Sequence, residues 1–159
     1  MVINQDFREF IALLNAKGVK YLVIGGYAVA FHGYPRYTKD IDFWIWLNEQ
    51  NAARMIEVLA DFGFASLGIH KEDFLNKNMV IQLGYPPNRI DLLTDLEGVD
   101  FEVCYERRQQ IDIEGLMVNF IDAENLIITK RISGRMQDLV DAEKLESGKN
   151  DDPDDHSLH

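Results

Sequence analysis

The sequence is short of cysteine, of long apolar runs and of a basic leader, and each shortage excludes a class of protein. A single cysteine, Cys104, rules out an internal disulfide and fits a reducing cytoplasm. No run reaches the roughly 18 apolar residues that a membrane helix needs, so we expect no membrane partner. The first residues, MVINQDFREF, are polar and acidic where a secretory signal would be basic and then apolar. These absences together predict a cytoplasmic protein.

Basic residues are scarce as well. The chain has 16 Lys and Arg against 27 Asp and Glu, which gives a formal net charge of −11. Duplex binding depends on clustered Lys and Arg, so this balance disfavours nucleic acid as a partner without excluding a local basic patch. A small anionic ligand stays open if a metal ion or a pocket supplies the positive charge.

What the sequence does contain is the profile of one globular domain. Its 159 residues are 47% hydrophobic and 27% charged, enough to bury a core without disulfides or metals. We assign residues 1–146 to a single domain. The remainder, SGKNDDPDDHSLH (147–159), is acidic and polar, and we expect it to be disordered.

Hydrophobic periodicity predicts alternating helices and strands along the domain. The predicted helices cover residues 5–17, 27–32, 48–63 and 99–110, and two more divide 122–146 at a break near Ser133-Gly134, with Asp122 as an N-cap. The predicted strands cover 21–24, 40–47, 78–84 and 89–95, with a hairpin over 111–121 that turns near Glu114-Gly115. This order predicts an α/β or α+β fold, in which helices pack on one face of a small mixed central sheet and the C-terminal part is helical.

Two aspartates stand on one face of the strand 40–47. Side chains at i and i+2 of a strand point the same way, so Asp40 and Asp42 converge while Ile41 faces the core. A third acid, Asp91, lies between two apolar residues of the strand 89–95. If the two strands are neighbours, the three carboxylates can share one site and hold two Mg²⁺ ions about 3.5–4 Å apart.

Simpler interpretations compete at each of these positions. An isolated D-x-D is often only a solvated strand end, and Arg36 could pair with the two aspartates in place of a metal. Trp44 and Trp46 share the carboxylate face, where they could line a pocket or pack in the core. His32 follows an apolar run and suits a half-buried structural role.

A longer pattern carries a family resemblance. GGYAVAFHGYPRYTKDID (25–42), the later apolar-Asp-apolar strand around Asp91, and KRISGRMQDLVD (130–141) resemble the nucleotidyltransferase superfamily that includes DNA polymerase beta. Within it, the chain is most similar to small bacterial proteins of minimal and AbiEii-like type. The resemblance implies a polymerase-beta-like fold and Mg²⁺-dependent transfer of NMP from an NTP such as ATP to an acceptor hydroxyl, with Mn²⁺ as an alternative metal.

The resemblance also implies roles for the three acids. Asp40 and Asp42 would hold both metals. Asp91 would hold the catalytic metal and act as base toward the acceptor hydroxyl, directly or through that metal.

It further implies how the nucleotide is bound. Gly25 and Gly26 would let the phosphates approach backbone N–H groups, as glycine permits. Lys130 would meet the triphosphate, and Arg36 and Thr38 are further phosphate candidates. Many members have Gly-Ser where this chain has Gly-Gly, so only backbone groups are left at that point.

Several alternatives stay open at the level of the sequence. Lys130 and Arg135 could be solvated helix residues. We interpret Asp138 and Asp141 as helix-surface or capping acids that stabilise the C-terminal helices. The acceptor could be a protein, an RNA end or a small molecule. By analogy the chain could belong to a toxin–antitoxin pair, with an antitoxin or a second copy as its partner. The alternative function is a catalytically silent module that keeps the fold and binds a nucleotide or a partner.

Overall fold

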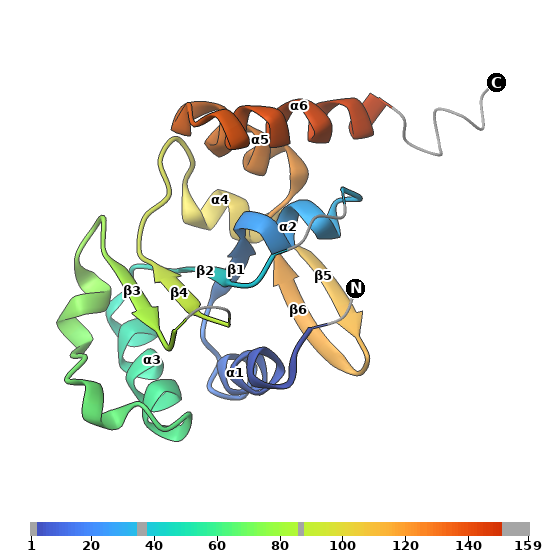
Figure 1. Ribbon diagram of the computed structural model, residues 1–159. Coiled ribbons are helices and arrows are strands. Elements are labelled where there is room, and N and C mark those ends of the chain that lie inside the picture. The colour runs from blue at the N-terminus through green and yellow to red at the C-terminus, as the bar shows by residue number, and fades with distance from the viewer. Residues whose placement is uncertain (1–2, 35–37, 86–87, 151–159) are drawn as a thin grey trace.

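A mixed six-stranded sheet forms the centre of the protein (Figure 1). The structure is a computed structural model that describes residues 3–34, 38–85 and 88–150, and side chains as far as residue 148. The strands are β1 (Tyr21–Ile24), β2 (Ile41–Ile45), β3 (Val80–Leu83), β4 (Ile90–Leu93), β5 (Gln109–Ile113) and β6 (Leu116–Phe120), in the order β3-β4-β2-β1-β6-β5. The mixed central sheet expected from the sequence is confirmed.

In the described part of the chain, six α-helices and two short 3₁₀ turns surround this sheet. The helices are α1 (Gln5–Ala16), α2 (Gly25–Phe31), α3 (Glu49–Asp61), α4 (Phe101–Glu106), α5 (Ala123–Ser133) and α6 (Met136–Asn150), and the 3₁₀ turns are η1 (Ala65–Leu67) and η2 (Lys71–Leu75). Asp122 caps α5 by accepting a hydrogen bond from the backbone of Asn125, as predicted. None of the helices in the described ranges has the length and apolarity that crossing a membrane requires.

Helices cover both faces of the sheet, so the expectation of helices on one face is wrong (Figure 1). Neighbouring residues of β2 face opposite sides, and both sides are occupied. Phe43 packs on Phe10 of α1 with ring centroids 5.5 Å apart, whereas Trp44 packs on Phe101 of α4 at 5.0 Å. The physical reason is visible in β1, whose four residues are all buried, because a strand buried on both faces needs cover on both.

The helix predicted over residues 99–110 is too long. It ends at Glu106, and Gln109 and Gln110 begin β5 instead. The side-chain amide of Gln110 donates a hydrogen bond to the side chain of Asn119 across the β5–β6 pair at 2.9 Å. The sequence around Gln110 does not predict this contact. The hairpin turn at Glu114-Gly115 is confirmed.

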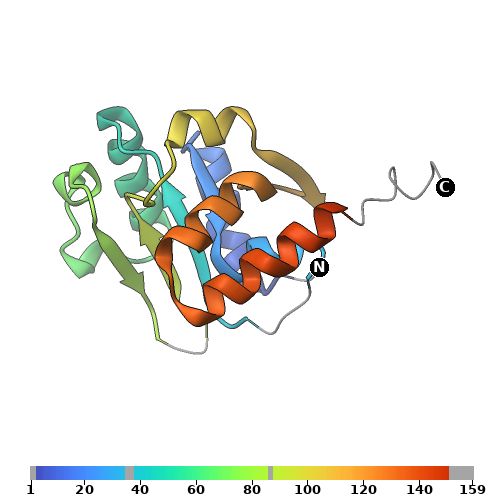
Figure 2. The same ribbon diagram turned by 90° about the horizontal axis from the view of Figure 1, so that it is seen from above.

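The C-terminal helices α5 and α6 lie side by side above the sheet (Figures 1 and 2). They join at Gly134, whose φ of +70° is the left-handed conformation that ends many helices, so the predicted break is confirmed. Helix α6 continues through residues 147–150, where we expected the disordered tail to begin. Gly148 lies so close to Tyr34 that a Cβ there would overlap the phenol, and this packing holds the end of the helix. Residues 151–159 lie outside the described ranges.

Candidate active site

The sheet brings Asp42 and Asp91 side by side. Strands β2 and β4 are parallel neighbours, and their register places Asp42 directly opposite Asp91. Asp91 is 7% exposed and Asp42 is half-buried. Burial, the charge of Asp91 and a hydrogen bond between the two carboxyl groups raise the pKa of Asp42 to about 7. The expected adjacency of the two strands is confirmed, and it places two acids where both cannot ionise freely.

Asp40 joins this pair through Arg89. The Arg89 guanidinium makes two hydrogen bonds to Asp91, Nε to Oδ1 at 2.7 Å and Nη2 to Oδ2 at 3.0 Å. Its Nη2 also lies 3.4 Å from Oδ2 of Asp40, and its backbone N–H donates to Oδ1 of Asp40 at 3.0 Å. The hydrogen bond to Asp91 raises the pKa of Arg89 above its ordinary value, so the guanidinium stays charged. The arginine thus links Asp40 to Asp91, and Asp42 lies opposite Asp91 on the neighbouring strand.

Arg89 is the residue that the sequence analysis missed. We considered Arg36 as the arginine that could pair with the acids, and Arg36 lies outside the described residues. The signal was present, because Arg89 stands two positions before Asp91 and strand periodicity puts i and i+2 on one face. Thr38, another expected phosphate ligand, donates its hydroxyl to the carbonyl oxygen of Asp40 at 3.1 Å.

Gly25 is required where the chain passes Asp42. Its φ is +70°, which disfavours any residue with a side chain, and a Cβ at this position would overlap Oδ2 of Asp42. Gly26 is buried in the first turn of α2. Gly25 thus lets the backbone lie against the carboxylate of Asp42 on the neighbouring strand.

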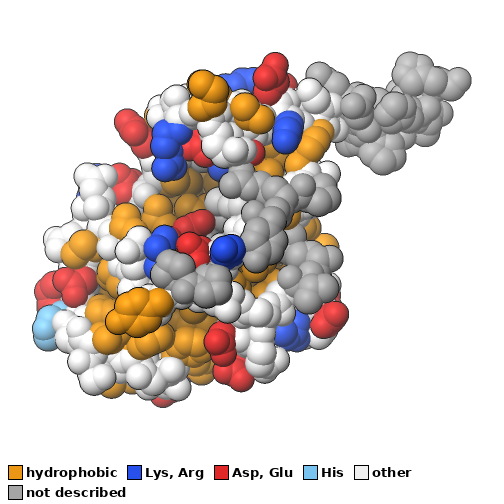
Figure 3. All heavy atoms as spheres, viewed as in Figure 1, with side chains coloured by type: hydrophobic (Ala, Val, Ile, Leu, Met, Phe, Trp, Pro, Cys, Tyr) orange, Lys and Arg blue, Asp and Glu red, His pale blue; other side chains and the backbone are white. Residues whose placement is uncertain are grey.

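A cavity of about 190 Å³ opens beside Asp42, between the sheet and the α5–α6 pair. Gly25, Asp42 and Lys130 line it, together with apolar side chains and with Ser133, Arg135 and Asp138. The space-filling view shows acidic and basic side chains gathered in the middle of the face below α5 and α6, next to apolar ones (Figure 3). The cavity is smaller than the roughly 300–1,000 Å³ usual for small-molecule sites, so it suits part of a nucleotide.

Lys130 reaches this cavity from a buried ion cluster. Its Nζ lies 3.1 Å from Oδ1 of Asp138 and 3.3 Å from Oδ2 of Asp141, and it is 9% exposed. Burial alone would raise the pKa of Asp138, but hydrogen bonds from Ser133 and Lys130 hold it below its ordinary value. Lys130 is therefore not a solvated helix residue. Asp138 and Asp141 fix the two C-terminal helices, as expected.

The donor set suits a hard divalent cation in its chemistry. Carboxylate oxygens are the ligands that Mg²⁺ prefers, and the raised pKa of Asp42 reflects crowded negative charge that a cation would relieve. Within the described part of the chain, no three His, Cys, Asp or Glu side chains form a ready ligand set. Asp42 and Asp91 adjoin, and Asp40 meets them only through Arg89. Asp42 and Asp91 are donors of the type that Mg²⁺ needs, and in this structure the Arg89 guanidinium engages Asp91 and Asp40.

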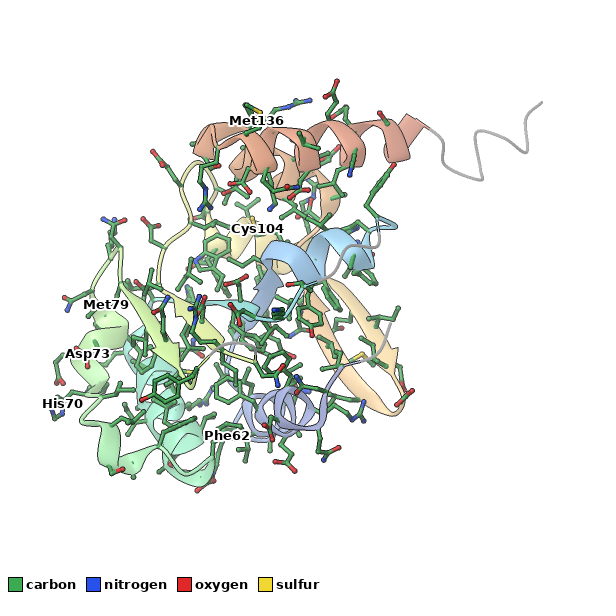
Figure 4. All side chains as sticks on the ribbon, viewed as in Figure 1. Phe62, His70, Asp73, Met79, Cys104 and Met136 are labelled. Carbon is green, nitrogen blue, oxygen red and sulfur yellow. The ribbon has the colours of Figure 1, made fainter. Side chains whose placement is uncertain are left out.

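Other candidate residues have structural roles. Trp46 stacks on Phe101 at 6.3 Å, so both tryptophans belong to the packing under α4. A ring nitrogen of His32 lies 2.7 Å from the carbonyl oxygen of Ile121, and burial lowers the pKa of this histidine. Cys104 lies inside the molecule, whereas Met136 stands on the outer surface of α6 (Figure 4). Burial raises the pKa of the Cys104 thiol to about 12, which leaves it unreactive.

Comparison with known proteins adds a family match. The family described as "Nucleotidyl transferase of unknown function (DUF2204)" matches residues 3–149. No curated protein matches the chain.

Solved structures of nucleotidyltransferases share the fold. A protein of Thermotoga maritima assigned to the nucleotidyltransferases is 17% identical with a TM-score of 0.57, covering 92% of this chain and 91% of its own. An antigenic nucleotidyltransferase-like protein from Paracoccidioides brasiliensis is 19% identical with a TM-score of 0.53, covering 92% and 77%. The lincosamide antibiotic adenylyltransferase LnuA, solved with lincomycin bound, is 18% identical with a TM-score of 0.56, covering 92% and 98%.

Proposed function

The chain belongs to the nucleotidyl transferase family of unknown function DUF2204, and from this premise we propose that it transfers NMP from an NTP to the hydroxyl of an acceptor in a Mg²⁺-dependent reaction. One observation carries the proposal. Asp42 and Asp91 adjoin on parallel strands, beside a cavity that Gly25 and Lys130 also line. Phosphoryl transfer requires carboxylates to hold metal ions, backbone that the phosphates can approach, and a positive side chain to pair with them. This cavity has residues of all three kinds.

Each side chain has a role in the proposed reaction. Asp40, Asp42 and Asp91 would hold the divalent ions, which supply positive charge to the phosphate oxygens when bound. Asp91 takes the proton of the acceptor hydroxyl, whose oxygen bonds to the α-phosphorus. The bond from that phosphorus to the bridging oxygen breaks, and pyrophosphate leaves.

The phosphates would lie between α2 and α5. The absence of side chains at Gly25 and Gly26 admits them to the backbone, and Lys130 pairs with the triphosphate at the expense of Asp138 and Asp141. Thr38 and Arg36 belong to the segment before β2 and stay proposed phosphate contacts.

A small hydroxylated compound is the acceptor that we favour. The fold is shared with an adenylyltransferase solved with a small antibiotic bound, and a net charge of −11 disfavours RNA. A place in a toxin–antitoxin pair stays a prediction, which the experiment below also tests because a protein or RNA acceptor would take the label.

Labelled transfer tests the proposal. The wild-type protein is incubated with each α-³²P-labelled NTP, Mg²⁺ and either cell extract or a panel of small hydroxylated compounds, and labelled products are separated by class. We expect Asp42→Asn and Asp91→Asn to lower transfer by about 10³-fold or more, since each removes a carboxylate needed in the transition state. Asp95→Asn, an exposed acid just after β4, is the matched control and should keep full transfer. Equal transfer by wild type and Asp91→Asn would exclude this site.

A second function is supported by the ion pairs. Arg89 pairs with Asp40 and Asp91, and Lys130 pairs with Asp138 and Asp141, so these charged groups have partners before any ligand binds. A silent module that binds a nucleotide would use the site in this form. Calorimetric titration with NTP separates the two functions, because the module would bind equally in EDTA and in Mg²⁺, whereas the enzyme needs the metal.

A further inference from the structure

Arg89 engages the same oxygens that a metal would need. Its guanidinium and its backbone N–H together contact both carboxylate oxygens of Asp91 and both of Asp40. A bidentate arginine–carboxylate pair is among the strongest hydrogen-bonded arrangements in proteins. Asp91 is almost fully buried, so this pair is little weakened by solvent.

We propose that Arg89 is a resident cation that holds the acidic site together without metal and leaves it when the metal–nucleotide complex binds. This inference rests on the proposed function, because it concerns how the same site is loaded. It assigns to Arg89 a positioning role in which the guanidinium and the divalent ion exclude one another.

Electrostatics makes the two cations alternatives. A guanidinium and a divalent ion bonded to the same carboxylate would stand about 4 Å apart, where like charges repel strongly in a partly buried site. Arginine does not lose its proton in proteins, so Arg89 can give way only by moving. Its side chain is 25% exposed and carries several rotatable bonds, so it can turn toward solvent without repacking the core.

Lys130, another cation that lines the cavity, has other partners in the described structure. Lys130 lowers the pKa of Asp42 from across the cavity, but its Nζ is bound to Asp138 and Asp141. Arg89 is consequently the side chain that neutralises Asp40 and Asp91 in the described structure. Free metal that displaces Arg89 leaves the guanidinium without an anionic partner. A metal–nucleotide complex brings phosphates with which the released guanidinium can pair. The site should therefore discriminate against free metal.

Metal binding without nucleotide tests this inference apart from activity. Mn²⁺ is titrated into wild type and Arg89→Gln and followed by electron paramagnetic resonance, and melting temperatures are measured in EDTA and in Mn²⁺. We expect Arg89→Gln to bind Mn²⁺ about tenfold more tightly, within the usual range of coupling between two sites. In EDTA the variant should melt below wild type, because the acids are left without a cation, and Mn²⁺ should raise its melting temperature more than that of wild type.

Two further variants keep the test decisive. Arg8→Gln is the matched control, since Arg8 bonds only backbone carbonyls of the β5–β6 turn, and its Mn²⁺ affinity should equal that of wild type. Arg89→Lys keeps the charge but loses the planar guanidinium that spans Asp40 and Asp91. Its affinity for Mn²⁺ should therefore rise by a smaller factor than that of Arg89→Gln. If Arg89→Gln does not fold, Arg89→Lys decides, and affinity no tighter than wild type overturns the inference.

The outcomes also separate this inference from the proposed function. If wild type binds Mn²⁺ with NTP but Arg89→Gln binds Mn²⁺ no more tightly than wild type, Arg89 is not a competing cation and the proposed enzyme stands. If neither protein binds Mn²⁺ with or without NTP, the metal-dependent function itself fails.

Discussion

The molecule contains two clusters of aspartates, and they are built in opposite ways. At the strand ends, Asp40, Asp42 and Asp91 lie together, and among the described residues Arg89 is the cation that bonds Asp40 and Asp91. Between α5 and α6, Asp138 and Asp141 meet two cations, Lys130 and Arg135. The first cluster thus has an excess of negative charge, and the second is balanced.

The pKa shifts follow this difference. Burial and the charge of Asp91 raise the pKa of Asp42, whereas hydrogen bonds from Ser133 and Lys130 overcome burial and lower that of Asp138. An acid whose neighbours favour its ionised form stabilises the folded protein. An acid crowded by other acids lowers the stability of the fold, and such acids are typical of functional sites. We therefore interpret the α5–α6 cluster as structural, and the strand-end cluster stays the candidate site.

Removing the cation from the balanced cluster should have the largest effect on stability. Lys130→Met leaves Asp138 and Asp141 buried without their shared ammonium group, which typically costs about 3–5 kcal/mol. The free energy of unfolding is measured by urea denaturation. Arg131→Met is the matched control, since the Arg131–Glu146 pair is exposed and should contribute less than about 1 kcal/mol. Equal losses in the two variants would mean that the buried cluster is not structural.

A methyl group beside the crowded cluster should have an intermediate effect. Gly25→Ala adds a Cβ at φ +70° and in conflict with Asp42, and we expect a loss of about 1–3 kcal/mol in the free energy of unfolding. Gly63→Ala has the same kind of positive φ, +99°, with nothing within 4 Å of the added carbon. The difference between the two variants isolates the contact with Asp42. Equal losses in Gly25→Ala and Gly63→Ala would show that the Asp42 carboxylate moves aside freely.

The smallest expected effect concerns His32, which belongs to neither cluster. Burial lowers its pKa below the ordinary 6.5, so the unfolded chain binds a proton more readily than the folded one. The stability that neutral His32 contributes is present above the unfolded pKa and is lost as pH falls from about 6.5 through the lower folded pKa. Urea titrations at pH 7.5 and 5.5 should show a smaller loss in His32→Gln than in wild type. The exposed His70 (Figure 4) gives a control for the substitution itself, and His70→Gln should change the free energy of unfolding at pH 7.5 by less than about 0.5 kcal/mol.

The candidate site could be predicted from the sequence where strand periodicity is sufficient. The i, i+2 rule placed Asp40 and Asp42 on one face, and the apolar neighbours of Asp91 marked it as a strand residue that faces the same site. Arg89 stands two positions before Asp91, so the same i, i+2 rule could have found it, but its bonds to Asp40 depend on the pairing of β2 with β4, which no local rule gives. The same limit explains the overlong helix before β5, which ends because Gln110 pairs with Asn119 across the hairpin.

By itself the sequence determined the local elements and their order: the helix break at Gly134, the hairpin turn at Glu114-Gly115, and the two strands that carry Asp42 and Asp91, with Asp40 just before β2. Backbone conformation and side-chain alternation are local properties, so periodicity and glycine positions are enough to fix them. Only the tertiary structure decided that Arg89 bonds Asp40 and Asp91, that Lys130 is buried against α6, and that helices cover both faces of the sheet. The Arg89–Asp40 contact depends on elements that are distant in the sequence, and the burial of Lys130 depends on how α6 folds back on α5. Burial then sets how strongly the charges of these groups act on one another.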